Sequence, residues 1–289
     1  MRHNILQGPN GLRAGWRLLI YFALLGAFGY LAYKIAEAAS RGRQVDTGSP
    51  IFAIVYTLIL ATVVLLAAGT MAKIEGRSIA EYGLPWRRAM NVQFWQAWVI
   101  SFVSLSLLLA SLRLAGAYSV GTLQLRGIEI LKNAILWAVA LIIAAIFEEF
   151  FYRGYLQFTL TGAIGFWPAA LTTSALMGAA HAFNPGWTVL GLLTVSGFGL
   201  IACFLLRRTG DLWMPLGLHA GWNWGEVYFY GVPSSGLMGK GHLLQGNFHG
   251  PAWLTGMPFG VEAGWPNVAV FLIWWFLFAK WLRQVKYPG

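Results

Sequence analysis

Long apolar stretches, separated by short polar or glycine-rich segments, dominate the hydrophobic pattern of the chain. About 20 consecutive apolar residues form an α-helix that crosses the hydrocarbon core of a bilayer. The pattern predicts eight such helices, at about 16–37, 50–72, 92–114, 130–152, 163–183, 187–206, 212–231 and 266–282. The fourth is expected to stay helical past Arg153, towards Gly162 and Gly165. The expected fold is therefore all-α, a polytopic membrane protein with a single transmembrane domain over residues 1–289.

The first apolar stretch shares features with cleaved signal peptides. Arg2, Arg13 and Arg17 precede it, and the tripeptide Ala36-Glu37-Ala38 follows it. The apolar region of a signal peptide is only about 7–15 residues long. The greater length of this stretch favours an uncleaved first transmembrane helix.

Composition and charge agree with a membrane protein. The chain is 58% hydrophobic and 10% charged, far from the averages of soluble domains. A net charge of +10 would suggest a nucleic acid partner in a soluble protein. Here the Lys and Arg residues flank apolar segments and form no patch with interleaved aromatic residues, so we expect membrane lipid and no nucleic acid.

Basic residues are distributed unevenly between the predicted loops. With the N-terminus inside, thirteen of the 20 Lys and Arg residues fall on the inner side and seven on the outer side. Because cytoplasmic loops carry the excess of Lys and Arg, both termini are predicted to be cytoplasmic. The inner set is Arg2, Arg13, Arg17, Lys73, Arg77, Arg87, Arg88, Arg153, Arg207, Arg208, Lys280, Arg283 and Lys286; the outer set is Lys34, Arg41, Arg43, Arg113, Arg126, Lys132 and Lys240.

Two connecting segments differ from simple loops. Residues 73–91 mix charge with apolar residues, which predicts a short interfacial helix ending at Gly83 and Pro85. Residues 232–265 are rich in Gly, Pro, Trp and Phe and too irregular to span a membrane. A loop of this length forms either a lid over a site or a packed external loop, and the packed loop is the more common.

A few polar and ionisable residues fall inside the predicted helices. Insertion of a charged residue at the centre of a membrane helix costs about 2.5–3.5 kcal/mol, so each is a candidate for function. The set is Glu148, Glu149, Arg153, His181, His219, Asn223 and Glu226.

Helical spacing groups these residues. Glu149 and Arg153 are four residues apart and can form an ion pair on one helix face. Glu148 is rotated by about 100° from Glu149 and lacks a dedicated cation, which makes it the better general base. His219 and Asn223 also share a helix face.

Depth and packing can also be estimated from the spacing. A chain reversal between Gly162 and Gly165 would place Glu148 and His181 at matching depth on antiparallel helices, because each residue adds about 1.5 Å. His219 would join this group if its own helix starts deeper in the membrane or tilts. Gly217, Gly221 and Gly225 form a stripe that allows another helix to approach closely.

Structural explanations exist for each residue taken alone. The Glu149–Arg153 pair can simply lock two helices together. An isolated intramembrane His is often a hydrogen-bonding group between helices. Glu226 falls near the end of its predicted helix, where solvation at the interface accounts for it.

Three motifs resemble those of a known family. The segments Glu148–Arg153, Met177–His181 and His219–Asn223 are similar to E-E-x-x-x-R, F-x-x-x-H and H-x-x-x-N, with Met177 in place of the usual Phe. On these motifs the chain resembles the CAAX prenyl-endopeptidase and bacteriocin-processing family of intramembrane proteases, also called CPBP or Abi proteins. Similarity extends to the stretches 13–19, 75–84 and 254–264, the last like a loop of some bacterial members. The implied location is the bacterial cytoplasmic membrane.

The resemblance implies a role for each motif residue. Glu148 would activate the attacking water, and Glu149 and Arg153 would position the catalytic groups. The residues implied to bind water or stabilise the oxyanion are His181, His219 and Asn223.

Metal dependence stays open at this point. Glu148, His181 and His219 could ligate Zn²⁺ and leave a fourth position open, but there is no H-E-x-x-H motif. If Glu148 were a ligand it could not act freely as the base, and Glu149 is committed to Arg153. A metal-free mechanism with glutamate-activated water is favoured.

The residues and the resemblance together predict an intramembrane endopeptidase. Its substrate would be a membrane-associated protein or peptide, for example one with a prenylated C-terminus or a leader. One alternative is a non-catalytic membrane immunity or partner-binding protein on the same scaffold. Another is an ion-coupled transporter with the glutamates as proton relay, although no internal repeat supports it.

Overall fold

The computed structural model describes residues 7–8, 11–42 and 44–287. Helices make up most of this part of the chain, and the few strands are short. The elements are β1 (Gln7–Gly8), β2 (Gly11–Leu12), α1 (Ala14–Ser40), α2 (Pro50–Glu75), α3 (Val92–Leu114), β3 (Tyr118–Leu123), α4 (Ile128–Phe150), α5 (Gln157–Ile164), α6 (Phe166–Ala180), α7 (Val189–Thr209), α8 (Trp213–Trp224), β4 (Leu244–Phe248), α9 (Ala252–Thr255) and α10 (Trp265–Trp281).

Helices occur at all eight predicted positions, and the all-α membrane fold is confirmed. Five helical segments of the described chain are long and apolar enough to cross a membrane: Ala14–Ser40, Pro50–Glu75, Val92–Leu114, Ile128–Ile164 and Val189–Thr209. The fourth segment continues past Arg153 into α5, as predicted, but with a kink at Gly154, where the backbone is not helical. Gly165 then reverses the chain with a φ of 83°. The remaining helices, α6, α8 and α10, are shorter.

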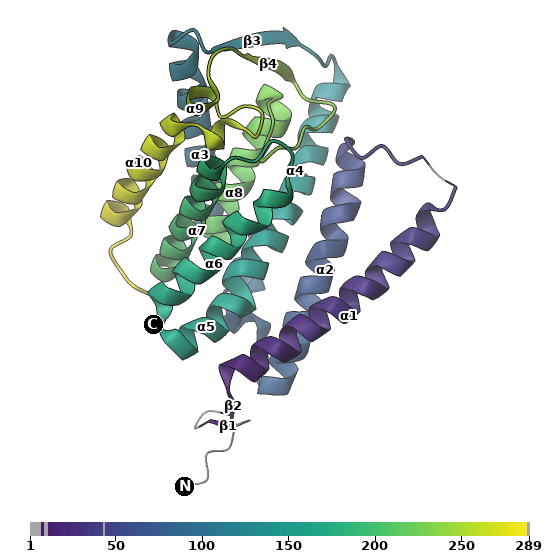
Figure 1. Cartoon of the computed structure of the whole chain (residues 1–289), viewed down its shortest axis with the longest axis vertical. Coiled ribbons are helices and arrows are strands. Elements are labelled where there is room, and N and C mark those ends of the chain that lie inside the picture. The colour runs from purple at the N-terminus through teal and green to yellow at the C-terminus, as the bar shows by residue number, and fades with distance from the viewer. Residues whose placement is uncertain (1–6, 9–10, 43, 288–289) are drawn as a thin grey trace.

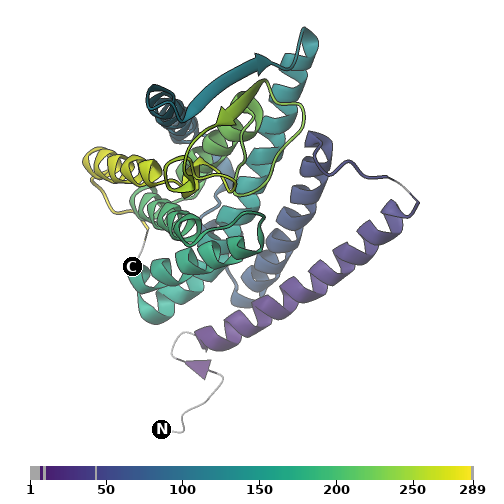
Figure 2. The ribbon, with the colours of Figure 1, turned by 45° about the horizontal axis from the view of Figure 1, so that its top comes forward.

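The helices form one bundle with α1 on its outside (Figure 1). α1 crosses α2 obliquely and diverges from the other helices towards its C-terminal end, as the rotated view in Figure 2 also shows. The strands β3 and β4 pair antiparallel at one end of the bundle, and the described ends of the chain lie at the other. Arg2 and Arg43, which entered the predicted charge bias, lie outside the described residues.

The predicted small-residue stripe on α8 faces α3. A Cβ atom on Gly217 would lie 2.7 Å from the backbone carbon of Phe94, and one on Gly221 would lie 2.7 Å from Cα of Trp98. A Cβ atom on Gly225 would lie 2.6 Å from Leu105. These glycines therefore allow α8, which carries His219 and Asn223, to pack directly against the backbone of α3.

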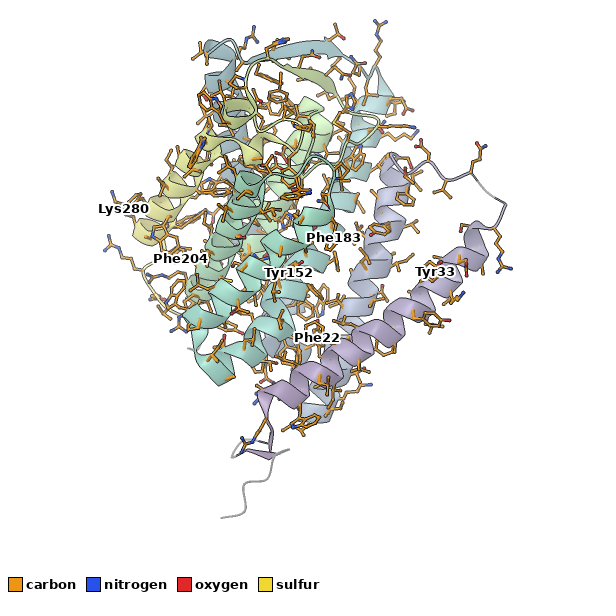
Figure 3. All side chains as sticks on the ribbon, viewed as in Figure 1. Phe22, Tyr33, Tyr152, Phe183, Phe204 and Lys280 are labelled. Atoms are coloured by element: carbon orange, nitrogen blue, oxygen red, sulfur yellow. The ribbon has the colours of Figure 1, made fainter. Side chains whose placement is uncertain are left out.

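Large apolar side chains cover the outer surface of the bundle, as expected where lipid is the solvent. Tyr33 on α1 is 60% exposed and Phe183 after α6 is 91% exposed; both are labelled among the side chains in Figure 3. Fully buried aromatic residues such as Tyr155 and Trp213 lie inside the bundle.

Both connecting segments are more ordered than a simple loop. The interfacial helix predicted in 73–91 is a single 3-10 turn, Ile79–Tyr82, which a Ser78–Glu81 capping box begins and Gly83 ends. A second 3-10 turn, Trp86–Arg88, follows it. Segment 232–265 folds back over the bundle, where it supplies β4 to the two-stranded sheet and lines the cavity described below.

Candidate active site

The two adjacent glutamates occupy the last turn of α4. Directly after them the helix widens into a π-helical turn, Phe151–Leu156, in which Gly154 has a ψ of −116°. A Cβ atom on Gly154 would lie 2.7 Å from the ring of Phe150, so the turn requires a glycine there. π-helical turns inside α-helices occur frequently at functional sites.

Glu149 and Arg153 form a fully buried ion pair. Arg153 Nη1 lies 3.4 Å from Glu149 Oε1, and both side chains are 0% exposed. Arg153 Nη2 also donates to the sulfur of Met177 at 3.0 Å. Met177, which stands where the motif usually has Phe, therefore contacts the charged pair.

His219 connects the two glutamates. Its Nδ1 lies 2.9 Å from Glu149 Oε1 and, because an ionised carboxylate only accepts, the Nδ1–H donates this hydrogen bond. Its Nε2 lies 3.9 Å from Glu148 Oε2, beyond direct hydrogen-bonding distance. The ring of Phe198 packs edge-on against the imidazole at 5.2 Å. His219, whose place in the site depended on the depth and tilt of its helix, is thus held by Glu149 with Nε2 facing Glu148.

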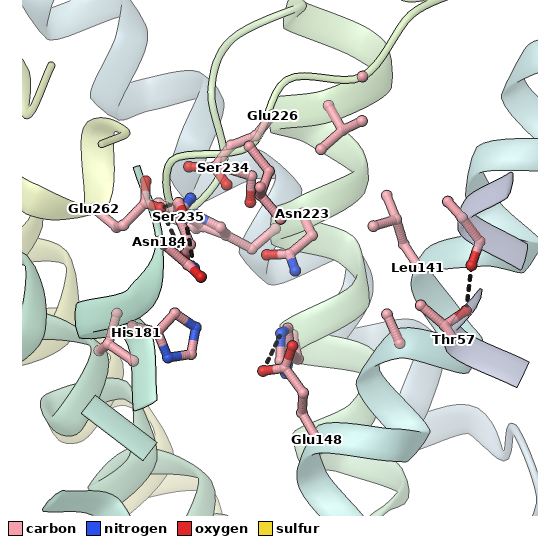
Figure 4. A pocket seen from close by; sticks show the side chains of 18 of the residues that line it. Thr57, Leu141, Glu148, His181, Asn184, Asn223, Glu226, Ser234, Ser235 and Glu262 are labelled. Carbon is pink, nitrogen blue, oxygen red and sulfur yellow. Dashed lines mark hydrogen bonds and ion pairs between the residues drawn. The ribbon is translucent and has the colours of Figure 1, made fainter. Parts of the chain in front are cut away.

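A cavity of about 620 Å³ opens beside these groups. Four of the six predicted catalytic residues line it: Glu148, His181, His219 and Asn223. Figure 4 shows Glu148, His181 and Asn223 pointing into the same space from three different segments. Glu149 and Arg153 lie behind His219 and do not line the cavity. The cavity walls also include the aromatic side chains of Phe52, Tyr56, Trp137, Phe147, Phe198, Trp222, Phe271 and Trp274.

The predicted depth relation between α4 and α6 agrees with this geometry. Glu148 and His181 line one cavity although 33 positions separate them in the sequence. His181 follows the last residue of α6, and its Nδ1 hydrogen bonds with the carbonyl oxygen of Met177 at 2.8 Å. That bond leaves Nε2 of His181 available to a molecule in the cavity.

The structure does not bring the conditional metal ligands together. Among the described residues, no three His, Cys, Asp or Glu side chains are close enough to hold a metal ion. Nδ1 of His219 is hydrogen-bonded to Glu149 and Nδ1 of His181 to a backbone carbonyl, so only Nε2 of each ring is free to act as a ligand. The predicted triad of Glu148, His181 and His219 does not fit Zn²⁺ in this arrangement, because the three side chains do not converge on one point.

The interpretation of Glu226 as an interfacial residue is wrong. Its side chain is 0% exposed and lines the cavity. α8 continues into a second π-helical turn, Gly225–Tyr230, and segment 232–265 folds back over this turn. Sequence reasoning also missed Glu262, which is 7% exposed and lines the same cavity. Its only signal was that it is the one carboxylate in a glycine-rich segment with little charge.

Comparison with known proteins identifies the segment that contains the site. Residues 130–225 match the family model described as Rce1-like, type II CAAX prenyl endopeptidase Rce1-like. Searches of curated proteins and of solved structures gave no match. The matched segment contains all three motifs, from Glu148 to Asn223, and confirms the resemblance that they predicted. The segment 130–225 of this integral membrane protein is therefore similar to the Rce1-like family of type II CAAX prenyl endopeptidases.

Proposed function

We propose that this protein is an intramembrane endopeptidase that hydrolyses a peptide bond with water activated by Glu148. One observation carries the proposal: His219 is held by Glu149 and faces Glu148 across 3.9 Å, at the wall of a cavity that His181 and Asn223 also line. A general base, hydrogen-bond donors for an oxyanion and a space for substrate are thus present together.

In the proposed reaction Glu148 accepts a proton from water as the water oxygen attacks the scissile carbonyl carbon. The carbonyl oxygen becomes an oxyanion, which the Asn223 amide can stabilise as a hydrogen-bond donor. His181 and His219 can donate to it from Nε2 only as imidazolium ions, because Nδ1 of each ring already faces an acceptor oxygen. Protonated Glu148 then gives its proton to the amide nitrogen as the C–N bond breaks. Glu148 ends the cycle ionised, so each proton is accounted for.

Glu149 and Arg153 act as positioning residues in this scheme. Glu149 fixes the His219 ring, because the donated Nδ1–H leaves Nε2 directed at Glu148. Arg153 keeps Glu149 ionised in a site that water does not reach. The pair thus has both roles that the sequence left open, since it stabilises the bundle and orients a catalytic group.

The walls of the cavity favour an apolar, membrane-associated substrate. Aromatic rings from α2, α4, α7, α8 and α10 surround the space beside Glu148. We propose that the substrate is a membrane-associated protein or peptide with a hydrophobic segment or lipid group near the scissile bond. A prenylated C-terminus and a hydrophobic leader both have this chemistry.

The proposal can be tested by comparing protein termini in membranes from cells that express wild type or Glu148→Gln. Glu148→Gln keeps the size and one acceptor oxygen of the side chain but cannot accept a proton. Termini that occur only with the wild type, at matched expression of folded protein, are the expected result. The sequences at these termini would also identify the substrate.

A matched control separates loss of the base from loss of charge. Glu129→Gln removes one carboxylate from the exposed first turn of the same helix, where Glu129 pairs with Lys132. This variant is expected to keep the wild-type termini. If wild type and Glu148→Gln give identical termini in the native host, the endopeptidase proposal fails. A non-catalytic binding function would then be the better explanation.

A further inference from the structure

Two carboxylates in this protein lack a basic partner. The chain contains ten Asp and Glu residues, all of them described by the structure. Eight have a Lys, Arg or His nitrogen within 4.0 Å. The other two, Glu226 and Glu262, form no ion pair with any described residue. They are also adjacent to each other and buried.

The pair lies in the wall of the candidate active-site cavity. Glu226 follows α8 by two residues and Glu262 comes from the segment that folds back over the bundle. Figure 4 shows both carboxyl groups near Ser234 and Ser235, with Asn223 between Glu226 and Glu148. Because the family match ends at residue 225, both glutamates lie outside the matched segment.

Ser235 holds Glu262 in place but leaves the rest of this buried pair without a strong hydrogen-bond partner. The backbone N–H and hydroxyl of Ser235 both donate to Glu262 Oε1. Neither oxygen of Glu226 nor Oε2 of Glu262 receives a hydrogen bond of ordinary geometry from the described residues, although Ser234 and Trp222 lie near the Glu226 carboxylate. Three carboxylate oxygens at the cavity wall therefore lack a well-placed donor.

This arrangement is unfavourable for the protein alone. Two ionised carboxylates in contact repel each other, and burial raises the pKa of Glu262. A shared proton relieves the repulsion but still leaves one negative charge in a site with no cation. An ammonium group carries three N–H donors and a positive charge, which matches three free acceptor oxygens. Trp222 and Trp274 also line this cavity and offer aromatic faces that attract cations.

We propose that Glu226 and Glu262 form a subsite that binds a basic side chain, Lys or Arg, of the substrate. The assignment rests on the proposed endopeptidase function, because it places this side chain in the cavity that contains Glu148. Cleaved substrates would carry the basic residue at a fixed distance from the scissile bond. The rest of the cavity wall would accept the apolar part of the substrate.

A binding experiment tests the subsite without any need for cleavage. The purified full-length protein in non-ionic detergent is titrated with n-butylammonium chloride and, in a separate experiment at the same ionic strength, with 1-butanol. Saturation-transfer NMR measures the binding of each compound. The ammonium ion is expected to bind at least about tenfold more tightly than the alcohol, because charge-assisted hydrogen bonds form only with the cation. Glu226→Gln and Glu262→Gln are each expected to remove this preference.

Controls separate the subsite from general charge effects and from misfolding. Glu129→Gln loses the same charge from the surface and is expected to bind butylammonium as the wild type does. Glutamine in place of either buried glutamate removes the repulsion between the two carboxylates, so both variants are expected to stay folded and monodisperse. If only one variant is folded, its binding of butylammonium is sufficient to test the subsite. Equal binding of ammonium and alcohol to the wild type, or unchanged binding in the two variants, would overturn the subsite.

Cleavage data give a second and separate result. If the wild type produces new termini, we expect a Lys or Arg at a fixed offset from each cleaved bond. Glu226→Gln should reduce cleavage at these sites at least about tenfold relative to cleavage at sites that lack the basic residue. New termini without such a residue would overturn the substrate assignment. If no new termini form, the endopeptidase proposal fails, while the butylammonium titration still decides whether the subsite exists.

Discussion

Replacement of Glu149 by Gln is expected to destabilise the protein by about 3–5 kcal/mol, because it leaves Arg153 charged and unpaired inside the bundle. The two charges are 3.4 Å apart and both side chains are 0% exposed. With an effective dielectric constant of about 20, their attraction is about 5 kcal/mol. The glutamine oxygen can still accept from Nδ1 of His219, so the loss comes mainly from Arg153.

Unfolding in mixed micelles with an increasing fraction of SDS measures this loss, with the fluorescence of the 15 Trp residues as the signal. Glu148→Gln is the matched control. Its side chain is 26% exposed and the basic group beside it is the His219 imidazole at 3.9 Å, so its cost should stay below about 1 kcal/mol. The double variant Glu149→Gln, Arg153→Met removes the unpaired cation and is expected to recover part of the stability. Equal costs for the two glutamate variants would refute the assignment of Arg153 to Glu149.

Three further predictions concern catalysis and packing. Asn223→Ala should lower kcat by about 10²–10³-fold with little change in stability, because one oxyanion donor is lost. The rate would be measured on any substrate that the terminus comparison identifies, and an unchanged kcat would show that Asn223 has no catalytic role. Gly221→Ala should lower the free energy of unfolding in the SDS assay by about 1–3 kcal/mol, since its Cβ would lie 2.5 Å from the Ser101 hydroxyl. Gly69→Ala in α2 is the control, because its Cβ would meet no atom within 4 Å, and it should be neutral or stabilising. Extensive dialysis against a metal chelator should leave cleavage unchanged if Glu148 activates water without a metal; loss of activity that Zn²⁺ restores would contradict this.

The helices were predictable because lipid imposes a long apolar pattern on each of them. α3, for example, spans Val92–Leu114, the range predicted from hydrophobicity alone. The strands β3 and β4 were not predicted, since each is short and their pairing joins residues more than 120 positions apart. The π-helical turns were also missed, because a periodicity of 3.6 residues assumes a regular α-helix.

The candidate site was predictable where it depends on spacing within one helix. Glu149 and Arg153 are i and i+4, and the structure pairs them. The contact between His219 and both glutamates depends on how α8 packs against α4, which no local spacing specifies. Glu226 was misinterpreted for a related reason, since its burial depends on a distant segment that folds back over the helix end.

The π-helical turn after Glu149 gives the helix one residue that it can lose without changing which way its later faces point. A π-helical turn holds one residue more than an α-helical turn. Deletion of Gly154 would allow the helix to close as a regular α-helix. About five residues of a π-helical turn and about four residues of an α-helix each complete one turn, so the segment after the deletion would keep nearly the same rotation relative to the glutamates. In related proteins that share this site, a chain one residue shorter after Arg153 should therefore be tolerated, provided that the spacing from Glu149 to Arg153 is kept.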